Sequence, residues 1–406
     1  MRILMLIQWC HPEPDFKCIP MACALRDRGH DVEVLTGFPN YPGGKVYPGY
    51  KIRPWSREVI QGIPVTRVAL YPSHDSSAAR RAANYGSFAL SASLLGPWLT
   101  RRPDVVYAYN PMGLPAMVLR WLENVPFVYD IQDLWPDSLF ASGMMSQWSS
   151  IEKLLGSFFK LVYRKASHLL VLSDGFKASL VARGVPANKV TVVYNWTNEI
   201  THQPQPADPA LATRLGMSRR LNIIYTGNIG KAQALDVVLS AARQLSQTRP
   251  EVLFTLVGGG TEREALRQQA ASDGLTNVQF LAAVPPTEIS ALCGLADGLL
   301  VHLRDEPLFR TTIPSKVQAY LATGKPLIAG VAGDARNLVE RSGGGICFTP
   351  EKTEQLVDAV EQLCRLSSRE RSEMGNRAAA FYRENLSIHV AAKEYERVFE
   401  AAIHGH

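Results

Sequence analysis

A chain of 406 residues, 46% of them apolar, is long enough to build two domains with separate cores. It has no run of about 18 apolar residues, which argues against a membrane-spanning helix. The pattern of the first residues predicts a strand, and it is too short for a signal peptide. The six cysteines form no CxxC pair and no metal-ligand pattern, so we expect the reduced thiols of a cytoplasmic protein.

The formal net charge of +6 lies in the first half of the chain. Residues 1–200 hold 21 Lys and Arg against 15 Asp and Glu, and residues 201–406 hold 22 of each. Two stretches, 76–102 and 144–165, combine apolar residues with cations, namely Arg80, Arg81, Arg101, Arg102, Lys153, Lys160, Arg164 and Lys165. These two stretches are either helices that lie on an anionic bilayer or ordinary helices that pack one face on the core and expose the other to solvent. Because the cations alternate with aliphatic residues and not with exposed aromatics, we expect no nucleic-acid partner.

In chain order, the hydrophobic pattern predicts alternating strands and helices. In the first half we expect strands at 3–9, 32–37, 105–109, 127–131, 169–172 and 190–194, a hairpin within 50–70, and helices at 19–28, at 113–123 and over both basic stretches. Segment 202–209, with three prolines, is the predicted linker. The second half repeats the alternation, with strands at 223–225, 253–257, 278–281, 298–303 and 326–331. Such repeats predict an α/β fold with two Rossmann-like parallel sheets, whose ligands bind beyond the carboxyl ends of the strands.

The most informative segment is 221–235, which predicts a strand, a glycine turn and the start of a helix. Gly227 and Gly230 allow a tight turn, and Lys231 stands beside the amides of the expected helix. Helix-terminal amides with a lysine form an anion site. The alternative is an ordinary turn with a solvated lysine.

Five segments, at 28–36, 133–137, 225–231, 257–262 and 313–326, together resemble the family 4 retaining glycosyltransferases with the GT-B fold. The resemblance extends to the bacterial WbuB-like branch, which is linked to fucosamine transfer. It implies an acceptor-side domain at 1–200, a linker at 201–210, a nucleotide-sugar domain at 211–390, and a final helix at 391–406 that packs back toward the first domain. The implied reaction transfers a sugar from a nucleoside diphosphate to an acceptor hydroxyl and retains the anomeric configuration.

The leaving diphosphate gains negative charge, so fixed donors must meet it. The resemblance implies that these are the amides of Gly227 and Asn228 and the charges of Lys231 and Lys316. The other donor-binding residues that it implies are Gly258, Gly259, Glu262, Ser315 and Gln318. Plainer alternatives are an N-cap at Ser315 beside a surface lysine and a simple glycine turn at 258–260. Asp-x-Asp is absent, so we expect no bridging metal, and no other cofactor is implied.

Several positions depart from the family pattern. Thr311 and Ala319 stand where most members have glutamates, and Glu306 or Gln318 are the available substitutes. In the first domain, Gln132 replaces the usual His. Asp133 is then the acidic residue expected nearest the anomeric carbon, unless it only caps a helix.

The acceptor-side residues that we expect besides Asp133 are Glu13, Arg80 and Arg81. The expected partners are a nucleotide sugar, most simply UDP-linked and of the N-acetyl-fucosamine type, and a polyprenyl-diphosphate-linked saccharide at the cytoplasmic face of the membrane. This would place the protein in surface polysaccharide (O-antigen or capsule) assembly. Two alternatives stay open: a sugar-nucleotide 2-epimerase and a catalytically silent member of an assembly complex. No P-loop motif and no dinucleotide fingerprint occurs.

Overall fold

The computed structural model describes the chain except for residues 15–16, 75–76, 136–148 and 219, and it divides into two compact units. Unit 1 comprises Met1–Tyr194 and Ile388–His406, and unit 2 comprises Asn195–Ser387. The boundary thus precedes the predicted linker. The last helix, α16 (Ile388–His404), belongs to unit 1, where it contacts α1 (Cys18–Asp27).

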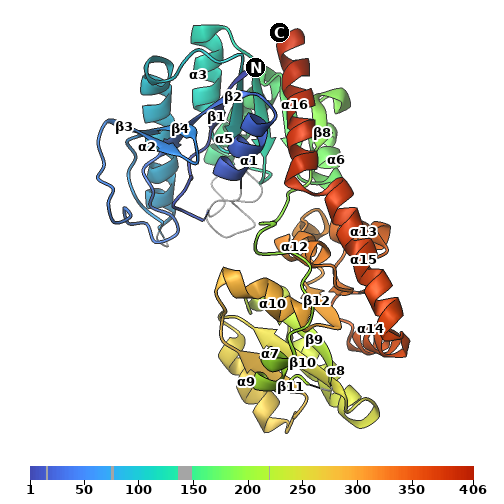
Figure 1. Cartoon of the computed structure of the whole chain (residues 1–406). Coiled ribbons are helices and arrows are strands. Elements are labelled where there is room, and N and C mark those ends of the chain that lie inside the picture. Colours follow the sequence, from blue (N-terminus) through green and yellow to red (C-terminus); the bar gives the residue numbers. More distant parts are fainter. Residues whose placement is uncertain (15–16, 75–76, 136–148, 219) are drawn as a thin grey trace. The chain divides into compact units, whose positions relative to one another are not determined.

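Within its described residues, unit 1 has an eight-stranded sheet in the order β3-β4-β2-β1-β5-β6-β7-β8 (Figure 1). Its strands are β1 (Arg2–Leu6), β2 (Asp31–Gly37), β3 (Trp55–Ile60), β4 (Ile63–Val68), β5 (Val105–Tyr109), β6 (Phe127–Ile131), β7 (His168–Val171) and β8 (Val190–Val192). Among the described strands of this sheet, only β3 and β4, the predicted hairpin, pair in the antiparallel sense. The strand order reverses between β1 and β5, and ligands of parallel sheets bind at the carboxyl ends of strands at such a switch point.

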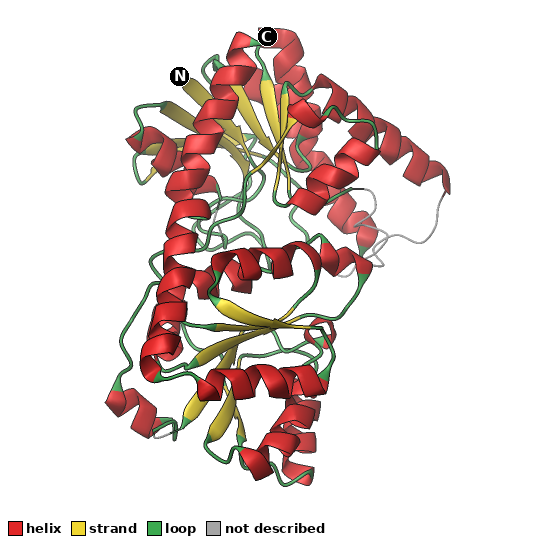
Figure 2. Cartoon of the chain, turned by 90° about the vertical axis from the view of Figure 1, so that its right-hand side faces the viewer, coloured by secondary structure: helices red, strands yellow, loops and turns green. Residues whose placement is uncertain are grey.

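Helices cover the sheet of unit 1 on both faces (Figure 2). Besides α1 and α16 they are α2 (Ala78–Leu99), α3 (Gly113–Glu123), α5 (Ser149–Lys165), α6 (Asp174–Ala182) and the short η1 (Ala187–Lys189). The central strands β1, β5 and β6 are buried on both faces, which explains why they read as continuous apolar runs. Phe88 of α2 and Met112 pack into this core.

Within its described residues, unit 2 has a six-stranded, wholly parallel sheet in the order β11-β10-β9-β12-β13-β14. Its strands are β9 (Leu221–Thr226), β10 (Val252–Val257), β11 (Val278–Leu281), β12 (Gly298–His302), β13 (Leu327–Gly330) and β14 (Gly345–Phe348). The order is that of a nucleotide-binding doubly wound sheet, with its switch point between β9 and β12. The predicted pair of Rossmann-like parallel sheets is therefore confirmed.

The helices of unit 2 are α7 (Pro209–Arg214), α8 (Asp236–Thr248), α9 (Arg263–Ser272), α10 (Ile289–Gly294), α11 (Pro307–Arg310), α12 (Ser315–Thr323), α13 (Gly333–Ser342), α14 (Thr353–Arg365) and α15 (Ser368–Asn385), with 3₁₀ turns η2 (Lys231–Gln233) and η3 (Pro286–Glu288). α7 begins within the predicted linker because Asp208 caps it and Pro209 suits a first helical position. Within the described part of the chain, every helix of both units is too short or too polar to cross a bilayer.

Candidate active site

Two glycine loops follow β9 and β10 at the carboxyl edge of the second sheet. The Gly227 amide donates to the Val257 carbonyl at 2.8 Å, and Ile229 donates to Gly259 at 2.7 Å. Gly258 has a φ of +140°, and a Cβ there would lie 2.0 Å from the carbonyl oxygen of Gly227. The loops therefore pack on each other, which is why Gly258 must be glycine. The Gly227 amide, expected to meet a diphosphate, is already used by this packing.

Lys231 lies in the 3₁₀ turn η2 and not at the start of a long helix. Ala234 follows in the left-handed region with φ of +41°, and α8 begins only at Asp236, later than predicted. The segment that follows β12 holds the turn in place, because the Arg304 Nε donates to the Lys231 carbonyl at 2.8 Å. The Lys231 side chain itself is exposed.

The segment between Gly227 and η2 still offers donors to an anion. Gln233 Oε1 accepts from the Gly230 amide at 3.1 Å and from Asn228 Nδ2 at 3.2 Å, which fixes the loop. Among the described residues, none accepts a hydrogen bond from the backbone amides of Asn228 or Lys231. The anion site thus consists of two amides and an ammonium on a short turn, in place of the predicted terminus of a long helix.

Lys316 is a second cation at this edge of the sheet, and no carboxylate within the described residues pairs with it. Its Nζ lies 4.9 Å from the centre of the Tyr225 ring. A Cβ on Gly227 would lie only 2.8 Å from Lys316 Cε, so the lysine lies directly against the glycine loop. Burial lowers the pKa of this ammonium to about 8. A half-buried cation without a counter-ion is an arrangement that an anionic ligand completes.

The rest of α12 corrects two expectations. Pro314 holds the N-cap position and Ser315 is the exposed first helical residue, so the plain-cap alternative for Ser315 is wrong. Gln318 is only 3% exposed, and its buried Oε1 has no hydrogen-bond partner within the described residues. Ala319 is buried in the helix, whereas the Thr311 hydroxyl donates to the Leu308 carbonyl.

Two nearby carboxylates border the same edge. Glu262 is half-buried before α9, and its amide donates to the Ile229 carbonyl at 3.0 Å. Glu306 is exposed at the start of α11. Glu306 therefore remains available as a ribose or sugar ligand, in place of the family glutamates.

In unit 1, Glu13 has a structural role that the sequence did not reveal. One carboxylate oxygen accepts from the amides of Asn40 and Tyr41, both at 2.7 Å, and the other accepts from the Cys10 amide at 3.0 Å. Burial raises the pKa of this carboxyl, and the three amides oppose that shift. Glu13 therefore holds two loops together, which corrects its expected role as a direct acceptor ligand.

A buried ion pair beneath this edge of unit 1 was missed from the sequence. Lys17 donates to Asp130 Oδ2 at 2.7 Å, and that oxygen also accepts from the hydroxyls of Tyr107 at 2.6 Å and Tyr395 at 3.0 Å. Burial lowers the pKa of Lys17, while Asp130 opposes the shift. An aspartate inside the apolar run of β6 was the available signal, because a buried carboxylate needs a cation or donors.

Asp133 follows β6 and is exposed. Its carbonyl accepts from Asn110 Nδ2 at 3.2 Å, and no described residue donates to its carboxylate. Desolvation by the surrounding protein raises the pKa of that carboxyl, even though the side chain is accessible. Gln132, at the position of the family's His, donates to Asp130 at 2.5 Å. The alternative role of Asp133 as a helix cap concerns residues from 136 onward, which lie outside the described residues.

The four arginines predicted to form one patch do not lie together. Arg80 and Arg81 are in the first turn of α2, whereas Arg101 and Arg102 follow its last residue, Leu99. A helix of 22 residues spans about 33 Å. Arg101 is moreover bound to Asp31 through two hydrogen bonds of 2.7 and 2.8 Å.

The exposed face of α2 is apolar instead. Leu90, Leu94 and Trp98, spaced four residues apart, are 57%, 62% and 84% exposed. α3 contacts α2 and carries Trp121, which is 81% exposed. In other proteins, exposed apolar patches are found at sites of protein or membrane interaction. We call these four residues the apolar stripe.

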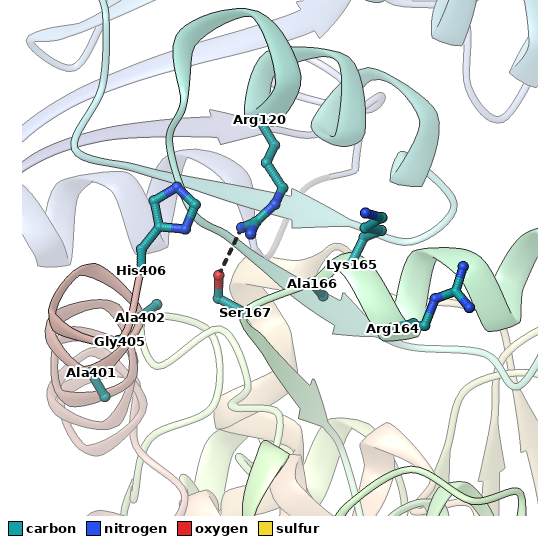
Figure 3. Close-up of a pocket in the computed structure, with 9 residues that line it drawn as sticks. All are labelled: Arg120, Arg164, Lys165, Ala166, Ser167, Ala401, Ala402, Gly405 and His406. Atoms are coloured by element: carbon teal, nitrogen blue, oxygen red, sulfur yellow. Dashed lines mark hydrogen bonds between the residues drawn. The ribbon is translucent and has the colours of Figure 1, made fainter.

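Cations gather elsewhere on unit 1. A cavity of about 420 Å³ is lined by Arg120 of α3, Arg164 and Lys165 of α5, and His406, with no acidic residue in its lining (Figure 3). Arg120 donates to the Ser167 hydroxyl at 3.3 Å. Ser167 precedes β7, so this cavity lies at the amino ends of the strands, opposite the edge where parallel sheets bind ligands.

Two family models match the chain, and both describe glycosyltransferase domains. Residues 20–196 match the glycosyl transferase 4-like domain, and residues 217–381 match the glycosyl transferases group 1. The chain is a glycosyltransferase with the GT-B fold. The two matched domains correspond to units 1 and 2.

Several known proteins resemble this glycosyltransferase along most of its length. WcaI of Escherichia coli (strain K12), a glycosyl transferase assigned to colanic acid biosynthesis, is 29% identical over 353 residues, which cover 83% of this chain and 85% of the relative. The Pseudomonas aeruginosa glycosyltransferase WbjE is 22% identical and covers 73% of this chain and 74% of its own. Anabaena HepE, solved in complex with UDP, has a TM-score of 0.70 at 18% identity and covers 98% of this chain and 100% of its own.

Proposed function

We propose that this glycosyltransferase transfers a sugar from a nucleoside diphosphate sugar, UDP-linked, to a lipid-linked saccharide in bacterial surface polysaccharide assembly, with retention of configuration. The assignment to WcaI of a role in colanic acid biosynthesis supports the polysaccharide role, and the UDP in the HepE crystal supports the nucleotide. Transfer of an N-acetyl-fucosamine type sugar, as implied by the resemblance to the WbuB-like branch, is part of the proposal.

The observation that carries the proposal is Lys316 at the switch point of unit 2, which pairs with no carboxylate among the described residues. A diphosphate bound there would meet the Lys316 and Lys231 ammonium groups and the amides of Asn228 and Lys231. Charge on the diphosphate grows as the glycosidic bond breaks, so these donors stabilise the transition state more than the bound substrate. The departing phosphate oxygen can accept the proton of the acceptor hydroxyl, and no separate base is needed.

Asp133 supplies the remaining charge in the proposed reaction. Its carboxylate is exposed, unpaired within the described residues, and follows β6 at the carboxyl edge of the first sheet. A carboxylate at this edge would stabilise an oxocarbenium-like centre or orient the acceptor hydroxyl.

A titration with UDP tests the nucleotide site directly. Lys316→Ala and Lys231→Ala should each weaken UDP binding, whereas Arg369→Ala, which removes an exposed cation from α15 of the same unit, should not. Equal affinities in all four proteins, wild type included, would place the diphosphate elsewhere.

A lipid-linked acceptor requires contact with a bilayer, and the apolar stripe is the surface we propose for it. Leucine and tryptophan side chains insert into the headgroup boundary, and the cations of α5 would add electrostatic attraction to anionic lipid. Vesicle flotation should show binding by the wild type and weaker binding after Leu94→Glu with Trp98→Glu. Ile200→Glu, at an 83% exposed apolar residue of unit 2, is the matched surface control. Unchanged flotation of the double variant would refute the surface.

The alternatives differ in their products. An epimerase would convert a UDP-sugar into the epimerised sugar nucleotide without an acceptor, and a silent complex member would bind UDP without turnover. The replacement of both family glutamates by Thr311 and Ala319 is the observation that favours the silent protein. Acceptor-dependent release of UDP from a nucleotide sugar would exclude both.

A further inference from the structure

All three carbonyls of the turn η2 accept hydrogen bonds from the end of β12 and the segment after it. The Arg304 Nε donates to the Lys231 carbonyl at 2.8 Å, and the Arg304 amide donates to the Ala232 carbonyl at 3.0 Å. The third carbonyl, that of Gln233, lies 2.7 Å from His302 Nδ1. Arg304 is exposed, whereas His302 is 1% exposed. The contact of His302 is therefore shielded from water, and a hydrogen bond is electrostatically stronger in such surroundings.

The two partners of His302 determine where its proton lies. Nδ1 faces a carbonyl oxygen, which can only accept, so Nδ1 carries the proton. Nε2 lies 2.9 Å from the amide nitrogen of Glu351, which can only donate, so Nε2 accepts. Burial lowers the pKa of the imidazole, while the bond to Gln233 and the charges of Glu351 and Asp236 oppose that shift. His302 is therefore a neutral imidazole in the Nδ1–H tautomer.

Packing fixes the plane of this imidazole. The Phe348 ring is stacked on it, with centroids 5.8 Å apart and an interplanar angle of 16°. A Cβ on Gly330 would lie 2.2 Å from His302 Cδ2, so the imidazole fills the space beside that glycine. Glu351 Oε2 accepts from the Asp305 amide at 3.1 Å. Glu351 thus binds both His302 and Asp305 and holds the segment between them.

Gln233 connects this fixed imidazole to the glycine loop. His302 binds the Gln233 carbonyl, and the Gln233 Oε1 accepts from the Gly230 amide at 3.1 Å and from Asn228 Nδ2 at 3.2 Å. This loop and η2 carry the amides of Asn228 and Lys231, which are proposed to meet the diphosphate. Donors that meet developing charge are most effective when they are fixed before the ligand binds.

We propose that His302 is a positioning residue for the diphosphate, and that as the Nδ1–H tautomer it holds η2 and, through Gln233, the loop that presents the Asn228 amide. This inference rests on the proposed function, because it concerns the diphosphate proposed to bind there. His302 is buried, so it acts through the turn and not by contact with the ligand. Without its N–H the turn is no longer fixed in advance, and the nucleotide must order it on binding, which lowers the affinity.

Isothermal titration with UDP on the full chain tests this role. His302→Leu removes both hydrogen bonds of the imidazole, whereas His302→Asn keeps an N–H close to the place of Nδ1, since both nitrogens are bonded to Cγ. We expect the dissociation constant to rise about tenfold in His302→Leu, equivalent to one lost hydrogen bond of about 1.4 kcal/mol. His302→Asn should restore it to within about twofold of wild type.

Two further variants complete the titration. His202→Leu is the matched control, because it removes another histidine of unit 2, one that bonds to Asn198, and it should leave the affinity unchanged. Gln233→Ala, at a partly exposed position, breaks the same connection one residue further on and should weaken UDP binding about as much as His302→Leu. It also provides the test if His302→Leu does not fold.

The tautomer is measured independently by long-range proton–nitrogen correlation NMR on the chain labelled at its histidine nitrogens. The chain has nine histidines, so the signal of His302 is assigned by its absence in His302→Asn. We expect a protonated Nδ1 and an unprotonated Nε2, both with and without UDP.

A role in packing alone would affect the two His302 variants alike, since both lose the stacked imidazole and the bond to Glu351. Equal weakening of UDP binding in these two variants, wild-type affinity in His302→Leu or Gln233→Ala, or a proton on Nε2 would overturn the proposal. If UDP binding weakens in Lys316→Ala but not in His302→Leu, this inference fails alone. If the wild type does not bind UDP, the proposed function fails, and the positioning role fails with it.

Discussion

The pKa of Lys316 gives the nucleotide site a pH dependence that can be measured. Burial lowers this pKa to about 8, so the free protein at pH 7 carries a protonated Lys316 in about nine molecules of ten, and at pH 9 in about one of ten. A diphosphate binds the protonated form. Between pH 7 and 9 the apparent affinity for UDP should therefore fall about tenfold. The affinity falls as the pH rises because a protein with a neutral Lys316 must take up a proton before it binds the diphosphate.

Isothermal titration with UDP at intervals from pH 7 to pH 9 measures this loss. Lys316→Arg is the matched control, since a guanidinium stays charged over the whole range. Ionisation of the nucleotide itself affects both proteins equally, so the difference between the two profiles isolates Lys316. Parallel profiles for wild type and Lys316→Arg would refute the reasoning, because Lys316 would then not titrate against the bound diphosphate.

Four further substitutions have expected outcomes. Lys231→Ala should lower the transfer rate about 100-fold with an unchanged thermal midpoint, as for the loss of one transition-state donor; a near wild-type rate in a steady-state assay would argue against a role of Lys231 at the diphosphate. Asp133→Asn should lower kcat more than it raises the KM for the nucleotide sugar, and an unaltered kcat would leave Asp133 without a catalytic role. Lys17→Met should lower the free energy of unfolding by about 3 kcal/mol in urea titrations, because it leaves Asp130 buried without its cation. Arg101→Met, which breaks the exposed pair with Asp31, should cost less than about 1 kcal/mol, and equal losses in the two variants would contradict the account of the buried pair.

The fold was predictable because the central strands of both sheets are buried on both faces. Segments such as β6, Phe127–Ile131, read as continuous apolar runs, and the predicted strand has the same bounds as the observed one. α3, Gly113–Glu123, was likewise found at its predicted bounds because its apolar residues recur with helical spacing. β14 was missed, since Gly345–Phe348 is short and only partly buried.

The site was less predictable, because its details depend on contacts between loops. The sequence pointed to Lys231, Lys316 and the glycine loops. It could not show that the Gly227 amide donates its hydrogen bond to the Val257 carbonyl. Nor could it show that the Glu13 carboxylate accepts hydrogen bonds from three backbone amides, since two of them, those of Asn40 and Tyr41, lie far from Glu13 in the chain. The prediction that four arginines share one basic surface was wrong for a different reason. The long helix α2 separates Arg80 and Arg81 from Arg101 and Arg102, which composition alone had grouped.

The most direct test of the account is an NMR analysis of the product formed from UDP-sugars on membranes that contain polyprenyl-diphosphate-linked saccharides. The account predicts release of UDP only when the acceptor is present, a product with the anomeric configuration of the donor, and a rate about 100-fold lower for Lys316→Ala. An inverted product, or an epimerised sugar nucleotide formed without acceptor, would contradict it.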